Sequence, residues 1–247
     1  MLNHFSRTEL LLGEENMSKL AQSKIAIFGI GGVGSYVAEG LARCGIGEFI
    51  LIDSDDISLT NINRQIHALE TTIGQKKTLM MKERILAINP QAKVTTIEKL
   101  YTPESNFFNW DDDYTYIVDA VDDVKAKINL IVNANKHNLP IMSSMGTANK
   151  LDPQKFVITD IYKTHTCPLA RIMRKTLKQQ GIKKLKVLYS TEEPFTNYTV
   201  NFKENTSKDN SPASTRKQPL GSISFVPPIA GLMIAGEIVK DICQINR

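Results

Sequence analysis

Short apolar runs alternate with helical patterns along most of this 247-residue chain. Continuous apolar runs predict buried strands, whereas apolar residues that recur every three or four positions predict amphipathic helices. The predicted strands cover 24–28, 48–53, 92–98, 115–120 and 139–144, and the predicted helices cover 33–44, 75–88 and 123–138. This alternation predicts an α/β fold, a doubly wound, Rossmann-like and largely parallel sheet.

Further elements are predicted toward both ends of the chain. Ser6 and Glu9 match a capping box, so a helical segment is expected before the first strand. Candidate strands at 155–161, 185–190 and 222–226 are expected to extend the sheet in antiparallel fashion. The polar stretch 195–219 has no periodicity and predicts a mobile loop within a single domain that covers 1–247.

The apolar run 225–242 predicts a core helix. It begins with two prolines and carries Glu237, Lys240 and Asp241, so it falls short of a membrane span. Membrane association is therefore not expected, and contact with a membrane surface remains the alternative.

A glycine-rich turn follows the first predicted strand. Gly29 permits the sharp turn, Gly31 lets the backbone approach a phosphate, and Gly34 lets the helix lie close to the strand, with Gly32 in the same loop. Asp53 ends the next strand, where an acid reaches a ribose hydroxyl. A nucleotide is predicted, with NAD, FAD, SAM and ATP all open, and a tight turn without ligand as the structural alternative.

Composition indicates the structural class of the protein and the cellular compartment that suits it. The chain is 42% hydrophobic and 23% charged, which suits one large globular domain. Its three cysteines share no CxxC spacing, so neither a disulfide framework nor a cysteine zinc site is indicated, and a reducing cytoplasm fits.

Positive charge is concentrated in one predicted helix. Between Asp160 and Glu192 every charged residue is basic. Four of them recur at helical spacing, and apolar residues take the opposite side of the same helix. This basic stripe predicts contact with the phosphate backbone of a nucleic acid, and a solvated helix face is the alternative. The stripe consists of Arg171, Arg174, Lys175 and Lys178, and the apolar side of Leu169, Ile172, Met173 and Leu177.

A second set of residues favours chemistry at phosphorus. Attack on phosphorus builds negative charge that Arg64 and Lys77 could neutralise, and hydride transfer would need no such cations. Asp122 ends a central strand, where a carboxylate holds Mg²⁺ against nucleotide phosphates. Taken singly, Arg64 and Lys77 could be ordinary surface residues and Asp122 a helix N-cap.

In this combination the chain resembles the adenylating enzymes related to ubiquitin-activating E1, which include the thiamine and molybdopterin pathway activators. The resemblance implies that Asp53 holds the ribose of ATP, that Asp122 binds Mg²⁺, and that Asn61, Arg64 and Lys77 contact the phosphates. Asp55 and Gln65 complete the matching positions in this sequence. The resemblance also implies a homodimer in which Arg7 reaches the nucleotide of the partner subunit.

Within that family, the sulfur-carrier activators carry two CxxC pairs, and this chain has none. Segments 143–153, 163–171, 190–194 and 221–228 instead resemble the branch that dehydrates threonylcarbamoyladenosine in tRNA. The implied reaction joins the carboxylate of the modified nucleoside to AMP and releases pyrophosphate. The urea group of the substrate then closes onto the activated carbonyl and expels AMP, with net loss of water, and the basic stripe holds the tRNA.

Two other functions remain open at this point. One is activation of the C-terminus of a ubiquitin-like or sulfur-carrier protein, with Cys167 as acceptor, since a helix start lowers a thiol pKa. The other is a nucleotide-dependent RNA-binding module without catalysis. A sulfur-transfer or redox partner is not specified by the sequence.

Overall fold

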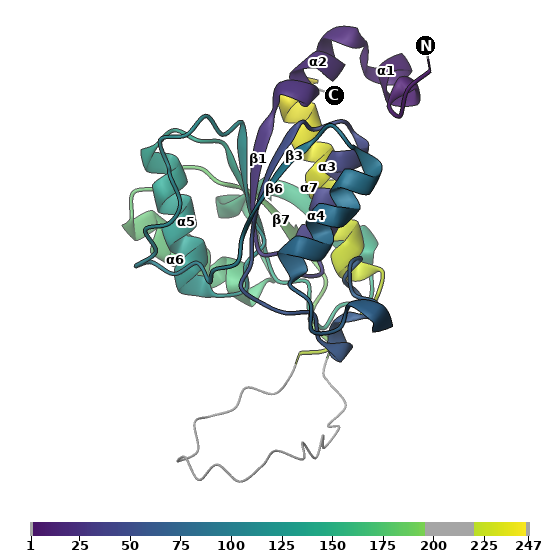
Figure 1. Ribbon diagram of the computed structural model, residues 1–247. Coiled ribbons are helices and arrows are strands. Elements are labelled where there is room, and N and C mark those ends of the chain that lie inside the picture. The colour runs from purple at the N-terminus through teal and green to yellow at the C-terminus, as the bar shows by residue number, and fades with distance from the viewer. Residues whose placement is uncertain (1, 196–219, 246–247) are drawn as a thin grey trace.

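The computed structural model describes residues 2–195 and 220–245 and is built around one seven-stranded sheet (Figure 1). The strand order is β3-β2-β1-β4-β5-β7-β6. β6 runs antiparallel to β7, and all other neighbouring strands are parallel. The predicted doubly wound, largely parallel sheet with an antiparallel extension is thus confirmed, but only β6 is antiparallel: the strand expected at 185–190 continues the parallel sheet next to β5. The strands are β1 (Lys24–Phe28), β2 (Glu48–Ile52), β3 (Lys93–Ile97), β4 (Tyr116–Asp119), β5 (Ile141–Ser144), β6 (Phe156–Asp160) and β7 (Lys186–Ser190).

Helices cover both faces of the sheet. One core joins α3, α4 and α7 to one face, and two others join α5, α6 and an aromatic segment at 101–114 to the opposite face. Because both faces are covered, the central strands are apolar and buried over nearly their whole length, with one charged residue at an end of each. The helices are α1 (Ser6–Leu12), α2 (Glu14–Gln22), α3 (Gly34–Arg43), α4 (Lys77–Ile88), α5 (Val124–Lys136), α6 (Pro168–Gln179) and α7 (Val226–Cys243), with short 3₁₀ turns at Leu59–Asn61, Glu70–Thr72, Pro153–Lys155 and Ile161–Lys163.

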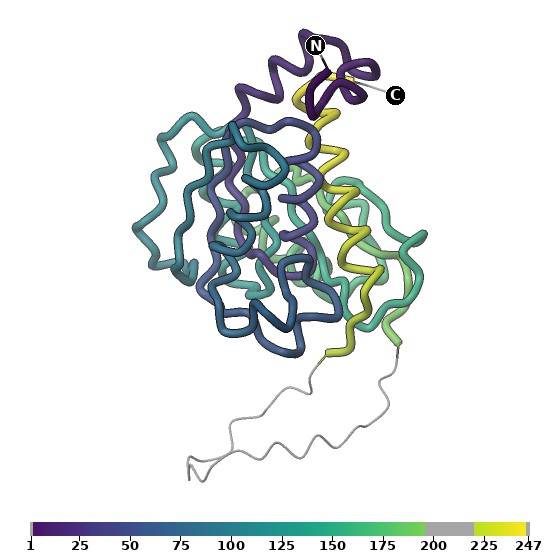
Figure 2. Tube along the Cα trace, turned by 45° about the vertical axis from the view of Figure 1, so that its right-hand side comes forward, coloured from purple at the N-terminus to yellow at the C-terminus, as the bar shows by residue number. Residues whose placement is uncertain are grey.

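The two ends of the sheet differ in what surrounds them. Figure 2 shows α7 running beside α3 toward α1 and α2, which project at the end where β1 begins. The glycine loop follows β1 and therefore lies at the other end, with the carboxyl ends of the parallel strands. Among the described residues, no helix is long and apolar enough to cross a membrane, and the core helix expected at 225–242 is α7.

Two further local predictions are wrong. No strand forms at 222–226: Val226 begins α7, because Pro227 and Pro228 occupy the first turn, where their missing N–H groups cost nothing. Ser6 does not cap a helix with Glu9. Phe5 stands at the N-cap of α1, and Ser6 Oγ accepts a hydrogen bond from the Asn3 N–H at 2.8 Å. The loop predicted at 195–219 falls, apart from its first residue, outside the described residues.

Candidate nucleotide-binding cleft

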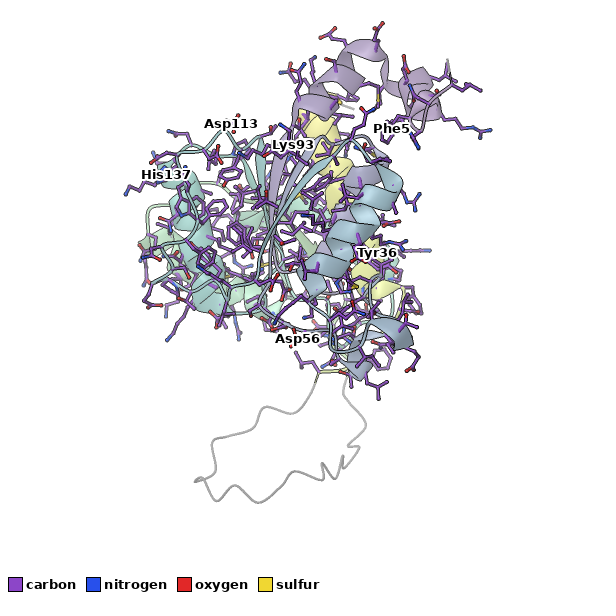
Figure 3. All side chains as sticks on the ribbon, viewed as in Figure 1. Phe5, Tyr36, Asp56, Lys93, Asp113 and His137 are labelled. Atoms are coloured by element: carbon purple, nitrogen blue, oxygen red, sulfur yellow. The ribbon has the colours of Figure 1, made fainter. Side chains whose placement is uncertain are left out.

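A cleft of about 620 Å³ opens at the carboxyl ends of β1, β2, β4 and β5. It lies where the strand order changes direction, with β2 on one side of β1 and β4 on the other, which is the position of ligand sites in open α/β sheets. Residues that follow β2 form part of its wall. Figure 3 shows Asp56, which lies close to them in sequence, at this end of the molecule and Phe5 at the other end. The predicted residues that line it are Gly29, Gly31, Gly32, Asp53, Asp55, Asn61, Arg64, Gln65, Lys77 and Asp122.

The glycine loop presents unbonded backbone amides to this cleft. Gly29 has a φ of 87°, and a Cβ there would lie 2.6 Å from the Ala120 carbonyl oxygen. A Cβ at Gly34 would lie 1.8 Å from the Gly29 carbonyl oxygen, so only glycine lets α3 begin this close to the turn. Within residues 2–195 and 220–245, the N–H groups at 31–34 find no acceptor. Free amides at a helix N-terminus form an anion site.

Asp53 is bound to the loop that it faces. Its Oδ2 accepts a hydrogen bond from the Ile30 N–H at 2.7 Å, and its Oδ1 accepts one from the Asp55 N–H at 2.9 Å. Burial raises the pKa of Asp53, while Lys77 and the two backbone bonds oppose the shift. The carboxylate therefore fixes the glycine loop in addition to any contact with a ribose.

Arg64 and Asn61 come from the turn that follows β2. Arg64 Nη1 donates to the carbonyl oxygen of Thr60 at 2.8 Å and to Asn63 Oδ1 at 2.9 Å, and burial lowers the pKa of this guanidinium. Asn61 is buried, and its Oδ1 accepts from the Ser58 N–H at 3.2 Å. The guanidinium is thus held by its own turn at the edge of the anion site.

Lys77 and Gln65 complete this side of the cleft. Lys77 is the first residue of α4, is 6% exposed, and places its Nζ 2.7 Å from Asp55 Oδ2. Gln65 is 6% exposed, and its Oε1 has no partner within the described chain. A buried ammonium next to free N–H groups is suited to a polyphosphate, whereas Gln65 Oε1 can only accept a hydrogen bond.

Asp122 is available for a cation. It is exposed, lines the cleft, and makes no hydrogen bond or ion pair with any described residue. The cap of α5 is its neighbour Asp123, whose Oδ1 accepts from the Ala126 N–H at 2.8 Å. The alternative of Asp122 as a helix cap is therefore wrong.

A buried ion pair supports the turn that carries Asp122. Lys127 Nζ lies 3.0 Å from Asp119 Oδ1 and donates to the Val121 carbonyl oxygen at 3.0 Å. Both charged side chains are 0% exposed. Sequence reasoning missed this pair, although a lysine four residues into an otherwise apolar helix face was a signal for it.

Sequence reasoning singled out segments 143–153, 163–171 and 221–228 by their resemblance but assigned none of their residues to the cleft. Residues 144–148, at and after the end of β5, line its opposite wall together with Leu169, Leu220, Ser222 and Pro227. Asn63 Nδ2 donates to the Ser222 carbonyl oxygen at 3.0 Å and so joins the Arg64 turn to this wall.

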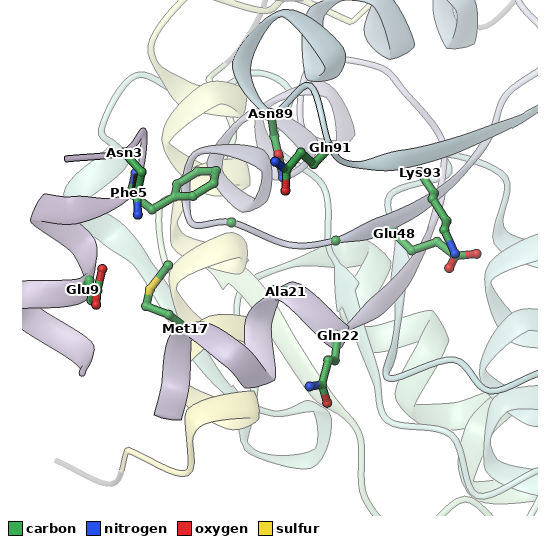
Figure 4. Close-up of a pocket in the computed structure, with 12 residues that line it drawn as sticks. Asn3, Phe5, Glu9, Met17, Ala21, Gln22, Glu48, Asn89, Gln91 and Lys93 are labelled. Atoms are coloured by element: carbon green, nitrogen blue, oxygen red, sulfur yellow. Dashed lines mark hydrogen bonds between the residues drawn. The ribbon is translucent and has the colours of Figure 1, made fainter. Parts of the chain in front are cut away.

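Arg7 is not brought to the cleft of its own chain. It is exposed on α1, at the end of the molecule where the strands begin. A second cavity of about 480 Å³ lies at that end, and Figure 4 shows Phe5, Met17, Asn89 and Lys93 in its wall.

The basic stripe lies on α6, whose first turn reaches the cleft through Leu169. Arg171, Lys175 and Lys178 are exposed. Arg174 is half-buried, and its Nη1 donates to the Thr164 carbonyl oxygen at 2.8 Å. On the apolar side, Met173 and Leu177 are buried, whereas Ile172 is 50% exposed.

Cys167 is the N-cap of α6. It is 4% exposed, and its Sγ accepts a hydrogen bond from the Ala170 N–H at 3.5 Å. A thiol in this position packs in the core and does not face the cleft.

This cleft, with its anion site, cations and free carboxylate at the switch point of the sheet, is that of a nucleotide-dependent adenylating enzyme. The family model described as "ThiF family" matches residues 5–247, and the chain belongs to this family. The expected resemblance to E1-like adenylating enzymes is thereby confirmed.

Individual relatives show which members of this family the chain is similar to. The tRNA threonylcarbamoyladenosine dehydratase of Bacillus subtilis is 43% identical over 247 residues, which cover 99% of this chain and 96% of that protein. The protein of the same name from Escherichia coli is 41% identical over 174 residues, covering 70% of this chain and 65% of its own. The solved structure of the E. coli tRNA N6-threonylcarbamoyladenosine dehydratase in complex with ATP superposes with a TM-score of 0.82 at 31% identity, covering 98% of this chain and 94% of that one.

Proposed function

We propose that this protein binds ATP in the cleft and dehydrates threonylcarbamoyladenosine in tRNA through an acyl adenylate. The observation that carries the proposal is the convergence of Arg64, Lys77 and Asp122 on the free amides of the glycine loop. The names of the relatives from B. subtilis and E. coli supply the substrate class.

The first step is nucleotidyl transfer. A carboxylate oxygen of the substrate attacks the α-phosphorus of ATP, the bond to the bridging oxygen breaks, and pyrophosphate leaves. The amides at 31–34 bind phosphate oxygens, and Arg64 and Lys77 neutralise the charge that grows on them. The cations cost no reorganisation, because Thr60 and Asp55 already hold them in place.

Mg²⁺ fits the donor set of this cleft. Among the described residues no cluster of three or more His, Cys, Asp or Glu side chains could hold a metal by itself. Mg²⁺ is commonly bound by one or two carboxylates together with phosphates and water, and Asp122 supplies such a carboxylate. Held by Asp122, the ion would supply positive charge that offsets the negative charge of the phosphates.

The second step needs no nucleophile from the protein. The urea group of the substrate forms a bond to the activated carbonyl, AMP takes away the carboxylate oxygen, and the urea loses a proton, so the net loss is water. Tethering supplies the orientation that an enzyme nucleophile would otherwise provide. The buried position of Cys167 agrees with this scheme.

Pyrophosphate exchange into ATP tests the first step and separates the functions that the sequence left open. Exchange stimulated by tRNA that carries threonylcarbamoyladenosine, and not by tRNA that lacks it, is the expected result. Stimulation only by a small carrier protein would replace this function with protein activation. Binding of ATP and tRNA with no exchange would favour a non-catalytic module.

Two variants and a matched control locate the chemistry. Arg64→Ala and Lys77→Ala should each lower exchange by about 100-fold or more, the usual cost of removing a group that stabilises charge in a transition state. Lys76→Ala is the control, because Lys76 pairs with Asp56 and lies outside the cleft. Equal activity of all three variants would remove Arg64 and Lys77 from the site.

For tRNA, we propose that the exposed members of the basic stripe bind the phosphate backbone. Replacing Arg171, Lys175 and Lys178 with Ala should weaken tRNA binding. It should also reduce, by about 2, the steepness of a plot of the logarithm of the tRNA binding constant against the logarithm of the salt concentration. Arg174→Ala should mainly lower stability, because its guanidinium is bound to Thr164. An unchanged slope in the triple variant would leave the stripe as a solvated face.

We also propose a homodimer in which Arg7 completes the site of the partner subunit. Its distance from the cleft of its own chain supports an action in trans. In a one-to-one mixture of Arg7→Ala and Arg64→Ala proteins, random pairing should restore about a quarter of wild-type activity, since half the dimers gain one intact site. No recovery after subunit exchange would refute the action of Arg7 in trans.

The three cysteines are free, which supports a cytoplasmic location.

A further inference from the structure

The residue at the centre of the glycine turn, Ile30, is held from two directions. Its N–H donates to Asp53 Oδ2 at 2.7 Å, and its carbonyl oxygen lies 2.8 Å from His67 Nε2. The first bond comes from the end of β2, and the second from the turn that also carries Asn61 and Arg64. Two separate elements therefore fix one residue of the anion site.

The contact with His67 determines where the next amide points. The peptide bond between Ile30 and Gly31 is trans and planar, so the Gly31 N–H points opposite to the Ile30 carbonyl. That carbonyl is directed at a histidine that is only 3% exposed. The Gly31 N–H is therefore directed away from the interior, and Gly31 lines the cleft. A Cβ on Gly31 would meet only Gln65 Nε2, at 4.0 Å, apart from its chain neighbours, so the side of Gly31 that faces the cleft is not crowded.

The state of the His67 ring follows from its surroundings. A carbonyl oxygen only accepts hydrogen bonds, so Nε2 carries the proton in this contact. Burial lowers the pKa of His67 to about 4, and the charges of Lys77 and Arg84 act in the same direction, while the bond to Ile30 opposes them. The ring is thus neutral at physiological pH, with one donor that is used on Ile30. Its Nδ1 has no partner in the described part of the chain.

We infer that His67 is a positioning residue for nucleotide binding, because its bond to the Ile30 carbonyl turns the Gly31 amide toward a phosphate group. It does not touch the nucleotide itself. The inference rests on the proposed function only in requiring that the phosphates of ATP occupy the glycine loop. The competing role is that of a buried side chain that stabilises the core.

Binding of ATP and of adenosine to the full-length protein separates these roles, since only ATP carries phosphates. His67→Phe keeps a ring of similar size and removes the donor. It should weaken ATP binding by about ten-fold, the effect of one charge-assisted hydrogen bond, and leave the dissociation constant of adenosine unchanged. His67→Gln places an amide donor where Nε2 was and should restore most of the ATP affinity.

Asn89→Leu is the matched control. Asn89 is also buried, and its Nδ2 donates to the carbonyl oxygen of Ile46 at 3.1 Å, at the far end of the sheet (Figure 4). The variant loses the same kind of bond and should lower the melting temperature while keeping the ratio of ATP to adenosine affinity.

Each outcome of this comparison is decisive. An unchanged affinity ratio in His67→Phe, or equal loss of ATP and adenosine binding, would assign His67 to the core and overturn the inference. The same follows if His67→Gln binds ATP no better than His67→Phe. If the wild-type protein does not prefer ATP to adenosine, the proposed function fails independently of His67.

Discussion

Replacing Lys127 with methionine would leave a carboxylate without its partner in the interior of the protein. Lys127 and Asp119 are both 0% exposed, with 3.0 Å between Nζ and Oδ1. Ser143 Oγ donates to the other oxygen of Asp119. Methionine approximates the length and volume of lysine, so Lys127→Met removes the charge and two hydrogen bonds with little change in packing.

The cost follows from the burial of the remaining charge. Removing one partner of a fully buried ion pair costs about 3–5 kcal/mol, because the other charge loses its compensation but stays out of water. A typical domain has a free energy of unfolding of about 5–15 kcal/mol, so this is a large fraction. Adding Asp119→Asn removes the unpaired charge and keeps an acceptor for Ser143. The double variant should recover to within about 2 kcal/mol of wild type.

Urea unfolding followed by circular dichroism measures the three free energies, with equal m-values as the condition for comparing them. Pyrophosphate exchange under conditions where each variant is folded is the second readout. Lys127→Met should lower exchange, because Lys127 also holds the Val121 carbonyl next to Asp122. A loss below about 1 kcal/mol in Lys127→Met, or a double variant less stable than the single, would refute the assignment of the ion pair.

Three further predictions concern the loop, the pH dependence and the thiol. Gly34→Ala should lower the free energy of unfolding in urea by about 3 kcal/mol or more, because the added Cβ would overlap the Gly29 carbonyl. Gly146→Ala is the control: its Cβ would meet nothing within 4 Å, so the free energy of unfolding should change by less than about 0.5 kcal/mol. Unfolded His67 takes up a proton near its usual pKa of 6.5, but the folded ring does so only near 4. Stability contributed by the neutral ring is therefore lost as the pH falls from 6.5 to 4. Over this range the free energy of unfolding of the wild-type protein should fall by about 3 kcal/mol relative to that of His67→Gln. A difference in free energy between the two proteins that does not change with pH would contradict this prediction. Cys167→Ser should retain cyclisation of the tRNA nucleoside, and its loss would revive the thioester route.

The strands were predictable to within one or two residues because local burial dictates their composition. β1, β2 and β4 lie between two helical layers, so apolar residues occupy nearly every position and the runs have clear ends. The same rule misled at 222–226, which forms no strand. Only its last residue, Val226, belongs to a regular element, because it begins α7, the core helix predicted over 225–242.

The site was predictable where its residues lie close together in sequence. The glycines and Asp53 follow consecutive strands, and parallel strands bring their carboxyl ends to one edge of the sheet. His67 acts on Ile30 across 37 residues, and no periodicity in the sequence encodes that contact. The sequence offered Asp122 as the cap of α5, and only the backbone geometry assigns the cap to Asp123.

Asn149 joins the loop that follows β5 to two segments that are distant in sequence, one of which leads into the wall opposite the glycine loop. Asn149 adopts a φ of 56°, in the left-handed region that asparagine tolerates better than most residues. Its N–H donates to the Gly221 carbonyl at 2.9 Å, its Oδ1 accepts from the Gly221 N–H at 2.7 Å, and its carbonyl accepts from the Phe195 N–H at 2.7 Å. The segments on both sides of 196–219 are thus bound to the loop that follows β5. Residues 144–148 and Leu220, Ser222 and Pro227 line this wall, and their connection through Asn149 could not be deduced from any single window of the sequence.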